Sequence, residues 1–272
     1  MSLIRKNHPI INVALLGAAG RMGRTIMETA GDFPDICISA ALVAEASPFI
    51  GQDAGGLAYT AGMEKALTHS DVLVDFSMPD STSKAIDACM VAHKPIIIGV
   101  TGLDAVLKQK IALASRTIPV LVAPNLSLGA VLLMQLARTA AAALGEDFAV
   151  DIKDQHHRHK KDAPSGTALA LGEAVAAGRG VTFKEHAIFE VPGQVMPAKH
   201  GGIRFTSVRQ GEIVGDHTVT FTSKTEHLQL MHHAGSRSAF ANGALTAARW
   251  IINQRPGTYD MADVLGIHAS QP

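Results

Sequence analysis

Short apolar runs alternate with stretches of helical periodicity along the first half of the chain. Each run has the length of a strand and is apolar almost throughout, as expected of a parallel strand buried on both faces. The runs occupy residues 10–16, 36–43, 72–76, 95–100 and 120–124. Helical stretches lie between them at residues 21–30, 80–93 and 103–115. This alternation predicts an α/β domain built on a doubly wound parallel sheet.

The pattern changes after Asn125. A long segment rich in Ala, Leu and Met, from Ser127 to Leu144, predicts one buried helix, and residues 148–155 then alternate like a half-solvated strand. Between residues 181 and 231, a period of two with glycine turns predicts antiparallel strands. The second domain is therefore predicted to be α+β, with a mixed, largely antiparallel sheet.

Helical character returns in residues 239–252, in a segment too short for a third domain, and we expect this helix to pack on the first domain. A chain of 272 residues also favours two domains, because a single hydrophobic core stops growing efficiently near about 250 residues. The predicted first domain comprises residues 1–126 and 239–272, and the predicted second domain comprises residues 127–238.

Composition and charge narrow the classes of function. The formal net charge is +0 and aromatic residues make up 4% of the chain, so neither charge nor base stacking favours a nucleic-acid partner. No apolar run approaches the roughly 20 residues that a membrane span requires. Arg5 and Lys6 before an apolar stretch are compatible with a signal peptide, but the glycine turn that follows favours a first strand.

The two cysteines, Cys37 and Cys89, stand in apolar surroundings without metal-ligand spacing, and we interpret both as thiols of the core. Two cysteines cannot form a disulfide framework, which agrees with a reducing, cytoplasmic location. The partner that the composition favours is a small polar molecule.

The segment from Gly17 to Gly23 has the pattern G-x-x-G-x-x-G. It follows a predicted buried strand and opens a predicted helix, which is the context of a Rossmann dinucleotide site. Glycine lets the backbone approach a pyrophosphate, and N–H groups at a helix start favour that anion. A purely structural turn is the alternative. We predict that this turn binds a dinucleotide.

Two further loops follow predicted strands, from Gly99 to Gly102 and from Ala123 to Leu126. They would face the same crevice, because ligands of open α/β sheets bind beyond the carboxyl ends of the strands. Either loop alone could be a plain connection. Their shared position after strands favours a role in ligand binding.

Residues 156–161 read HHRHKK and place six basic side chains in succession. A metal site could use His157 and His159, with Asp154 and Asp162 as the only carboxylates nearby in sequence. A solvated basic patch without a role is the second interpretation. The third interpretation is a proton-delivery site.

The third interpretation gains support from residues 165–167, SGT, which open an alanine-rich helix. N–H groups and hydroxyls at such a helix start can hold a carboxylate or a phosphate. A histidine, or a lysine among cations, can deliver a proton near neutral pH. With a nicotinamide cofactor to supply hydride, these groups could reduce a polarised double bond in an anionic substrate.

Four motifs span nearly the whole chain. They are GAAGRMGR at residues 17–24, HHRHKKDAPSGTALALGE at 156–173, GEIVGDHTV at 211–219 and SRSAFANGAL at 236–245. Together they resemble the dihydrodipicolinate reductase family of bacterial lysine and diaminopimelate biosynthesis. The resemblance implies an NAD(P)H-dependent enzyme that reduces 4-hydroxy-tetrahydrodipicolinate, or the dehydrated cyclic imine dicarboxylate, to tetrahydrodipicolinate. It also implies a homotetramer formed through the second domain.

The resemblance further implies roles for individual residues. His156 corresponds to the catalytic proton donor or acceptor and Lys160 to a proton donor, while His157, Gly166 and Thr167 correspond to substrate contacts. No metal is expected. The cofactor-binding residues implied by the resemblance are Gly17, Ala18, Ala19, Gly20, Arg21, Met22, Gly99, Val100, Thr101, Ala123, Pro124, Asn125 and Leu126.

The chain departs from the family after the second predicted strand. Some members have an acidic and then a basic residue there, which grip the adenosine ribose or its 2′-phosphate, whereas this chain has Val43 and Ala44. Glu45 is one or two positions late, and Arg21 remains available for a phosphate. The choice between NADPH and NADH stays open, with NADPH or dual use favoured because a well-placed carboxylate is missing.

Two other interpretations keep the fold but change the activity. A different two-domain nicotinamide oxidoreductase would act on an amino acid or a sugar, and the block HHRHK with SGT argues against it. A catalytically silent nucleotide sensor would be expected to lack His156 or Lys160, and both are present. Which of these two residues delivers the final proton is left open by the sequence.

Overall fold

The computed structural model describes residues 9–189 and 200–267. These residues form two compact units. The first unit contains residues 9–127 and 238–266, and the second contains residues 128–189 and 200–237, together with Ile267. The chain therefore leaves the first unit after Ser127 and returns to it at Ser238.

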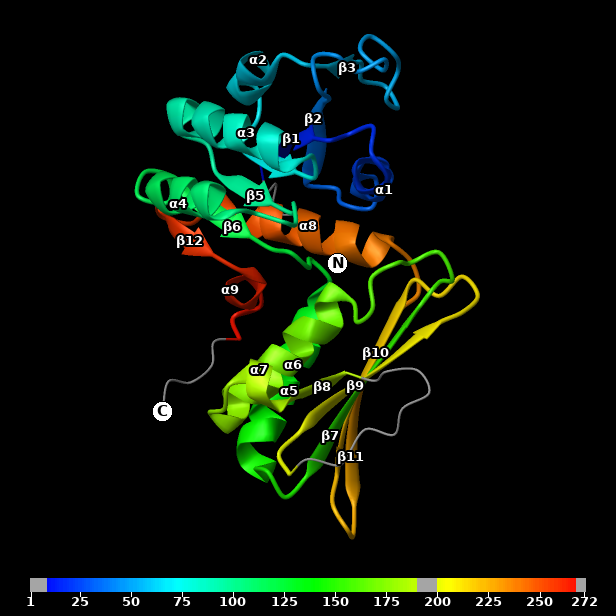
Figure 1. Ribbon diagram of the computed structural model, residues 1–272. Helices are drawn as coiled ribbons and strands as arrows, with labels where there is room; N and C mark the ends of the chain where they lie inside the picture. The colour runs from blue at the N-terminus through cyan, green and yellow to red at the C-terminus, as the bar shows by residue number, and fades with distance from the viewer. Residues whose placement is uncertain (1–8, 190–199, 268–272) are drawn as a thin grey trace, which may run out of the picture. The chain divides into compact units, whose positions relative to one another are not determined.

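The first unit is built on a seven-stranded sheet in the order β12-β6-β5-β4-β1-β2-β3, with every neighbouring pair parallel (Figure 1). Its strands are β1 (Ile11–Leu16), β2 (Ile36–Leu42), β3 (Tyr59–Thr60), β4 (Val72–Asp75), β5 (Ile96–Ile98), β6 (Pro119–Val122) and β12 (Gly257–Tyr259). From β1 in the centre, the strands first follow one another toward the β3 edge. From β4, on the other side of β1, they continue toward the β12 edge. The predicted doubly wound parallel sheet is confirmed.

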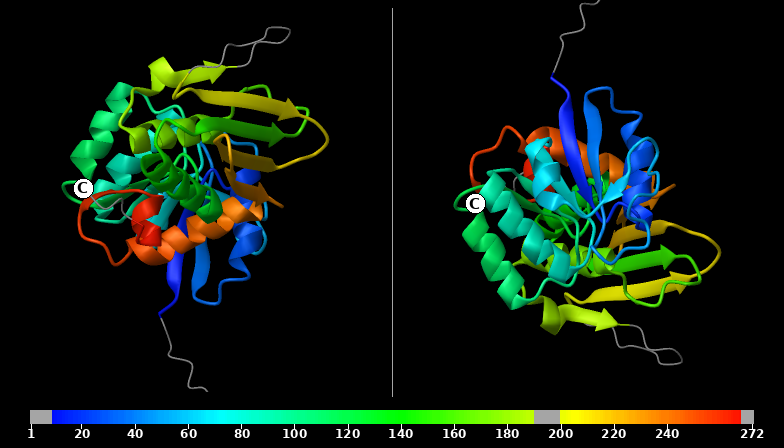
Figure 2. Two further views of the ribbon diagram at one scale, coloured as in Figure 1. Left: turned by 90° about the horizontal axis from the view of Figure 1, so that it is seen from below. Right: turned by 90° about the horizontal axis from the view of Figure 1, so that it is seen from above.

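Helices cover the sheet in two groups (Figure 2). They are α1 (Arg21–Ala30), α2 (Met63–Thr68), α3 (Pro79–Ala92), α4 (Ala105–Ala114), α8 (Ser238–Ile251) and α9 (Met261–Leu265). α1 lies beside α8, whereas α3 packs between α2 and α4. Leu16 and Leu73 belong to a core cluster with residues of α3 and α4, while α8 packs against β1, β4 and β5. Apolar cover on both faces explains the continuous apolar runs of the strands.

Two strands of this sheet were not predicted, and one cysteine was placed wrongly. β3 has 2 residues and β12 has 3, and neither lies in an apolar run like the one that contains β5. Cys89 is buried as predicted, but Cys37 is exposed. β3 pairs only with Ala41 and Leu42, so the first half of β2, where Cys37 lies, forms an edge of the sheet.

The second unit contains a five-stranded sheet in the order β11-β10-β7-β9-β8. Its strands are β7 (Ala149–His156), β8 (Ala187–Phe189), β9 (Ile203–Arg209), β10 (Gly215–Thr222) and β11 (His227–Ala234). The predicted mixed sheet is confirmed, but it is not largely antiparallel, and the prediction of antiparallel strands is wrong for β8 and β9. β10 is antiparallel to β7 and β11, whereas β9 is parallel to both β7 and β8. The helices between β7 and β9 provide the crossover that a parallel pair requires, and a period of two does not encode strand direction.

Three helices belong to this unit: α5 (Leu128–Leu144), α6 (Gly166–Arg179) and α7 (Phe183–His186). α5 and α6 pack against each other, and their apolar residues share a core cluster with Ile152, Phe205 and Phe221 of the sheet. Although α5 is apolar, neither it nor any other helix in the described part of the chain is long and apolar enough to cross a membrane.

Candidate active site

The glycine turn joins β1 to α1 and is shaped by close backbone contacts. Gly17 has a φ of 82°, and a Cβ there would lie 2.6 Å from the Phe76 carbonyl oxygen. A Cβ on Gly23 would collide with the backbone of Gly17 and Ala18. Gly20 precedes α1 and gives it no side-chain cap, so the helix start can offer backbone N–H groups to an anion. The turn therefore fits the pyrophosphate of a dinucleotide.

A loop after β4 borders this turn, and it was not among the loops predicted from the sequence. The chain reverses its building direction between β1 and β4, which is where ligands bind in open α/β sheets. Phe76 follows β4, and its carbonyl group approaches Gly17. A Cβ on Gly99, after β5, would lie 2.7 Å from the Phe76 ring. Phe76 thus packs between two of the predicted cofactor loops.

Asp75, the last residue of β4, anchors the Phe76 loop. Its carboxylate accepts hydrogen bonds from the Ser77 backbone N–H at 2.8 Å, the Ser77 hydroxyl at 2.5 Å and the Thr82 hydroxyl at 2.6 Å. Burial raises the pKa of Asp75, and these hydrogen bonds offset that effect only in part. An aspartate that ends an apolar strand, in the sequence VLVDFS, was the signal that could have identified this loop.

The remaining predicted cofactor residues lie at the same carboxyl edge. Gly99, Val100 and Thr101 follow β5, and Ala123, Pro124, Asn125 and Leu126 follow β6. Val100, Ala123 and Leu126 are buried, so these positions can offer mainly backbone groups to a ligand. A Cβ on Gly243 of α8 would collide with the Leu126 carbonyl group, which holds this loop against α8.

The region after β2 contains a cation that sequence reasoning did not single out. Val43 is buried, whereas Ala44 and Glu45 are exposed. Arg24 of α1 donates a hydrogen bond from Nε to the Ala19 carbonyl oxygen at 3.0 Å, and its guanidinium carbon lies 5.5 Å from the centre of the Phe49 ring. The guanidinium therefore lies between the glycine turn and the loop after β2.

The basic segment of the second unit begins at the end of β7. This strand alternates between a buried and an outer face, and Asp154 and His156 share the buried face. The His157 N–H donates to the Ile213 carbonyl oxygen at 2.7 Å, and the Gln210 N–H donates to the His156 carbonyl oxygen at 2.9 Å. The connection between β9 and β10 thus holds the turn that carries the histidines.

Asp154 is fully buried and is the centre of a polar cluster. Its Oδ1 lies 2.8 Å from His156 Nδ1 and 3.4 Å from His217 Nε2. Its Oδ2 accepts hydrogen bonds from the Arg209 guanidinium at 2.8 Å and from the Ser165 backbone N–H at 2.9 Å. Burial alone would raise the pKa of this carboxyl, but the contacts with these four residues outweigh burial and hold the pKa far below its ordinary value. Asp154 is therefore ionised at neutral pH.

Lys160 lies in the turn and is paired with a carboxylate. Its Nζ is 2.9 Å from Asp162 Oδ2, and its backbone N–H donates to the His157 carbonyl oxygen at 3.1 Å. Burial would raise the pKa of Asp162, but the hydrogen bond from Lys160 lowers it overall. The pair holds the ammonium group close to the histidine turn, with 24% of the Lys160 side chain exposed.

His157 faces further cations. Its ring centre lies 6.2 Å from that of His159. Desolvation, then the charge of Arg237, and then the charges of His159 and His156 lower the pKa of His157. An anion bound here would relieve this repulsion. Arg237 was not among the predicted site residues, although it lies in the motif SRSAFANGAL.

The start of α6 joins this cluster. Ser165 caps the helix by accepting a hydrogen bond from the Ala168 N–H at 3.2 Å, and its Oγ lies 3.1 Å from His217 Nε2. Gly166 is exposed, and a Cβ there would meet nothing within 4 Å. A ligand can therefore approach the helix start closely. Because the Ser165 N–H is also bonded to Asp154, the predicted anion site and the His156 ring belong to one cluster.

The structure does not support a metal site that uses His157 and His159 as ligands. In the described part of the chain, the group with metal-binding geometry is Asp154, His156 and His217, without His157 or His159. Arg209 and the Ser165 N–H already occupy one oxygen of Asp154, and the guanidinium would repel a metal cation. The cluster is better suited to proton handling.

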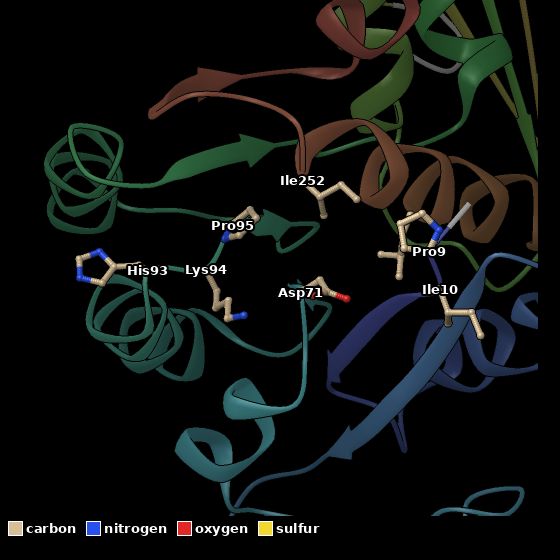
Figure 3. A pocket seen from close by; sticks show the side chains of 8 residues that line it. Pro9, Ile10, Asp71, His93, Lys94, Pro95 and Ile252 are labelled. Atoms are coloured by element: carbon tan, nitrogen blue, oxygen red, sulfur yellow. The ribbon is translucent and has the colours of Figure 1, made fainter. Parts of the chain in front are cut away.

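A pocket of about 370 Å³ lies at the amino ends of strands in the seven-stranded sheet, opposite the ends that carry the glycine turn (Figure 3). Its lining residues are Pro9, Ile10, Ile11, Asp71, His93, Lys94, Pro95 and Ile252. Most of them precede or begin β1, β4 and β5, so the pocket lies at the amino ends of these strands. It is separate from the glycine turn, and ligands of such sheets bind at the carboxyl ends.

Comparisons with known proteins match both units. The family model for the dihydrodipicolinate reductase N-terminus matches residues 11–126, and the model for the C-terminus matches residues 129–265. The 4-hydroxy-tetrahydrodipicolinate reductase of Nitrosospira multiformis is 43% identical over 264 residues, which cover 94% of this chain and 98% of the relative. The protein of the same name from Thiobacillus denitrificans is 42% identical, covering 94% and 99%.

Solved structures share the fold. The dipicolinate-bound dihydrodipicolinate reductase from Paenisporosarcina sp. TG-14 has a TM-score of 0.76 and 23% identity, covering 93% of this chain and 98% of that one. GenD2 from gentamicin A biosynthesis, in complex with NAD, has a TM-score of 0.60 and 14% identity, covering 98% and 94%. At these identities the likeness concerns the fold alone.

Proposed function

The chain belongs to the dihydrodipicolinate reductase family, and on this premise we propose that it reduces 4-hydroxy-tetrahydrodipicolinate to tetrahydrodipicolinate with a reduced nicotinamide dinucleotide. The substrate gains a hydride and a proton and loses water, and the nicotinamide is oxidised. The reaction serves bacterial lysine biosynthesis through diaminopimelate. The observation that carries the proposal is the single cluster in which Asp154 joins His156 to the start of α6.

The first unit fits a nicotinamide dinucleotide. We assign the pyrophosphate to residues 17–22 and further cofactor contacts to residues 99–101 and 123–126. The positions where a Cβ would collide, Gly17 and Gly23, and the start of α1 without a side-chain cap support this assignment. The bound cofactor supplies the hydride. The first unit binds the cofactor at the carboxyl ends of the strands.

We further propose that the enzyme uses both NADPH and NADH and prefers NADPH. Val43 and Ala44 offer no carboxylate to the ribose hydroxyls, and the Arg24 guanidinium is placed to neutralise a 2′-phosphate. Replacing Arg24 with Ala should lower kcat/KM for NADPH about tenfold and leave that for NADH within about threefold. Equal losses with both cofactors would contradict this role for Arg24.

The second unit supplies the substrate contacts. We propose that the Gly166 and Thr167 N–H groups and the Thr167 hydroxyl bind one carboxylate of the ring, and that His157 contacts the substrate. His156 and Lys160 handle the proton. A helix start and neighbouring cations favour a dicarboxylate, and holding both carboxylates also orients the ring for attack.

We further propose a homotetramer, formed through the second unit, that works in the cytoplasm. β11 ends the five-stranded sheet and exposes Leu228 and Met231 by 41% and 61%, which leaves an apolar edge for another copy. Cys37 and Cys89 are both free thiols, as expected in a reducing compartment. Light scattering should give a mass near four times 28.5 kDa, and a monomeric mass would contradict the assembly.

The test is the initial rate of nicotinamide oxidation on substrate generated in situ. Pyruvate and aspartate semialdehyde, with the preceding synthase, supply the unstable cyclic compound. We expect turnover with NADPH and with NADH, and none when the synthase is omitted. No turnover with either cofactor, despite tight cofactor binding, would contradict the proposed reaction.

A further inference from the structure

The carboxylate of Asp154 touches two parts of the site that a substrate must meet together. One is the His156 ring, whose Nδ1 lies 2.8 Å from Oδ1. The other is the first turn of α6, where Ser165 donates its backbone N–H to Oδ2 at 2.9 Å. The side chains of Asp154 and His156 are 1% and 10% exposed, so water competes little for these contacts. One carboxylate therefore connects the proton-handling ring with the anion-binding helix start.

The surroundings keep this carboxylate ionised and in place. Arg209 neutralises it from the Oδ2 side at 2.8 Å. His217 is 3.4 Å from Oδ1 through its Nε2, and the same nitrogen lies 3.1 Å from the Ser165 Oγ. Side chains of β7, β9 and β10, together with a backbone N–H at the start of α6, thus fix Asp154 from several directions.

The two nitrogens of His156 have different surroundings. Nδ1 and the facing Oδ1 of Asp154 are both buried and lie 2.8 Å apart, and neither atom has a hydrogen-bond partner of regular geometry among the described residues. A carboxylate facing Nδ1 favours the tautomer that carries its proton on Nδ1. On the Nε2 side lies Gly215, where a Cβ would be only 3.0 Å from Nε2. Gly215 therefore leaves a space beside Nε2 that a side chain at this position would fill.

We propose that Asp154 is a positioning residue for the reduction, which keeps the His156 proton on Nδ1, leaves Nε2 to exchange a proton with the ligand, and fixes the ring relative to the start of α6. The proposal rests on the proposed function. The proposal deepens that function by assigning to Asp154 an action through His156 rather than on the substrate itself. The rival account is that Asp154 only holds β7, β9 and α6 together.

Replacing Asp154 with Asn separates the two accounts, because the side chain keeps its shape. The amide oxygen can still accept from Arg209 and Ser165, which leaves the amide NH₂ beside His156 Nδ1. A donor at this place requires Nδ1 to accept, so the ring proton moves to Nε2. We expect kcat to fall about 10²-fold while KM for the substrate stays within about threefold. Imidazole nitrogen shifts of histidine-labelled protein should report the change from the Nδ1–H to the Nε2–H tautomer.

Asp151→Asn is the matched control on the same strand. Asp151 lies on the outer face of β7, its side chain is 44% exposed, and it is 3.7 Å from the Arg204 Nε. This variant should keep kcat within about twofold and leave the His156 tautomer unchanged. A loss equal to that of Asp154→Asn would indicate a general effect on β7 and would overturn the proposal.

A double-mutant cycle with His156→Gln tests whether Asp154 acts through His156. In the His156→Gln background, Asp154→Asn should lower kcat by less than about threefold, because the ring it positions is gone. A full additional loss would favour the purely structural role. If Asp154→Asn fails to fold by circular dichroism, the tautomer of the unsubstituted protein decides, and an Nε2–H ring would overturn the proposal. That measurement needs no turnover, so it remains decisive if the proposed reaction itself fails.

Discussion

The two candidate sites, one in each unit, are built from different groups of the polypeptide. The first is the dinucleotide edge, our name for the loops at residues 17–23, 99–101 and 123–126. It is made mainly of backbone, and its central element is the contiguous turn at residues 17–23. The cluster in the second unit is made mainly of side chains around Asp154, and these come from positions as distant along the chain as Arg209 and His217. A backbone site is encoded locally, whereas a side-chain cluster exists only once the sheet has formed. The two candidate sites should therefore fail in different ways when single residues are replaced.

The largest effect is expected in the second unit, from Lys160→Ala. Loss of a proton donor should lower kcat about 10²-fold or more, while cofactor affinity stays within about threefold because the dinucleotide edge is untouched. Steady-state kinetics and cofactor titration by fluorescence measure the two quantities. Lys161→Ala, at the exposed neighbouring position, is the control and should keep kcat. Full turnover of Lys160→Ala would remove the assigned role.

The dinucleotide edge should respond to Gly17→Ala with the opposite signature. A methyl group there meets the Phe76 carbonyl oxygen and the left-handed backbone is strained at a cost of about 1–3 kcal/mol, so cofactor affinity should fall about tenfold or more. Gly180→Ala has a similar backbone conformation in the second unit, with nothing within 4 Å of the added Cβ. This control should lose stability but not cofactor affinity. Equal cofactor affinity in both variants would show that the turn does not hold the dinucleotide.

Thr167→Val tests the start of α6. Removing a hydroxyl that donates to a carboxylate costs ~1.5 to 3 kcal/mol, so KM for the substrate should rise about tenfold or more. The exposed Thr139 of α5, replaced by Val, is the control, and KM should not change. An unaltered KM for Thr167→Val would count against a carboxylate at this helix start.

The smallest expected effect is a dependence of ligand affinity on pH. The pKa of His157 is lowered in the free protein, and a bound dicarboxylate would raise it, so binding takes up a proton. Affinity for pyridine-2,6-dicarboxylate should therefore increase as the pH falls from about 8 to about 6, by at most about tenfold per pH unit for one proton. Calorimetry in buffers of different ionisation enthalpy measures both quantities. His157→Gln should flatten the profile, and affinity that rises with pH would contradict the assignment.

The same contrast explains what the sequence could and could not predict. Most of the first unit follows from apolar runs and spacing within about ten residues. This holds for the glycine turn, for the strands β1, β2, β4, β5 and β6, and for the helices α1, α3, α4 and α8. Phe76 and Arg24 were missed because their importance comes from contacts with Gly17, Gly99 and Phe49, which are distant in sequence or lie across a turn.

In the second unit, the HHRHKK segment was visible, but its organising residue was not. Asp154 stands two positions before His156 on an alternating strand, and this spacing places both side chains on one face. What the spacing does not give is Arg209, Ser165 and His217, which reach Asp154 only after β7, β9, β10 and α6 have assembled. The parallel pairing of β8 and β9 was hidden for a related reason, because periodicity does not specify a neighbour or a direction.

The measurement that tests the central claim most directly is the fate of the hydride. Two samples of reduced cofactor, each with deuterium at one of the two C4 positions of the nicotinamide, would be oxidised on substrate generated in situ. One sample should give tetrahydrodipicolinate with one deuterium on a ring carbon by mass spectrometry and NMR, and the other should give unlabelled product. Nicotinamide oxidation without deuterium in the product from either sample would contradict direct reduction of the ring.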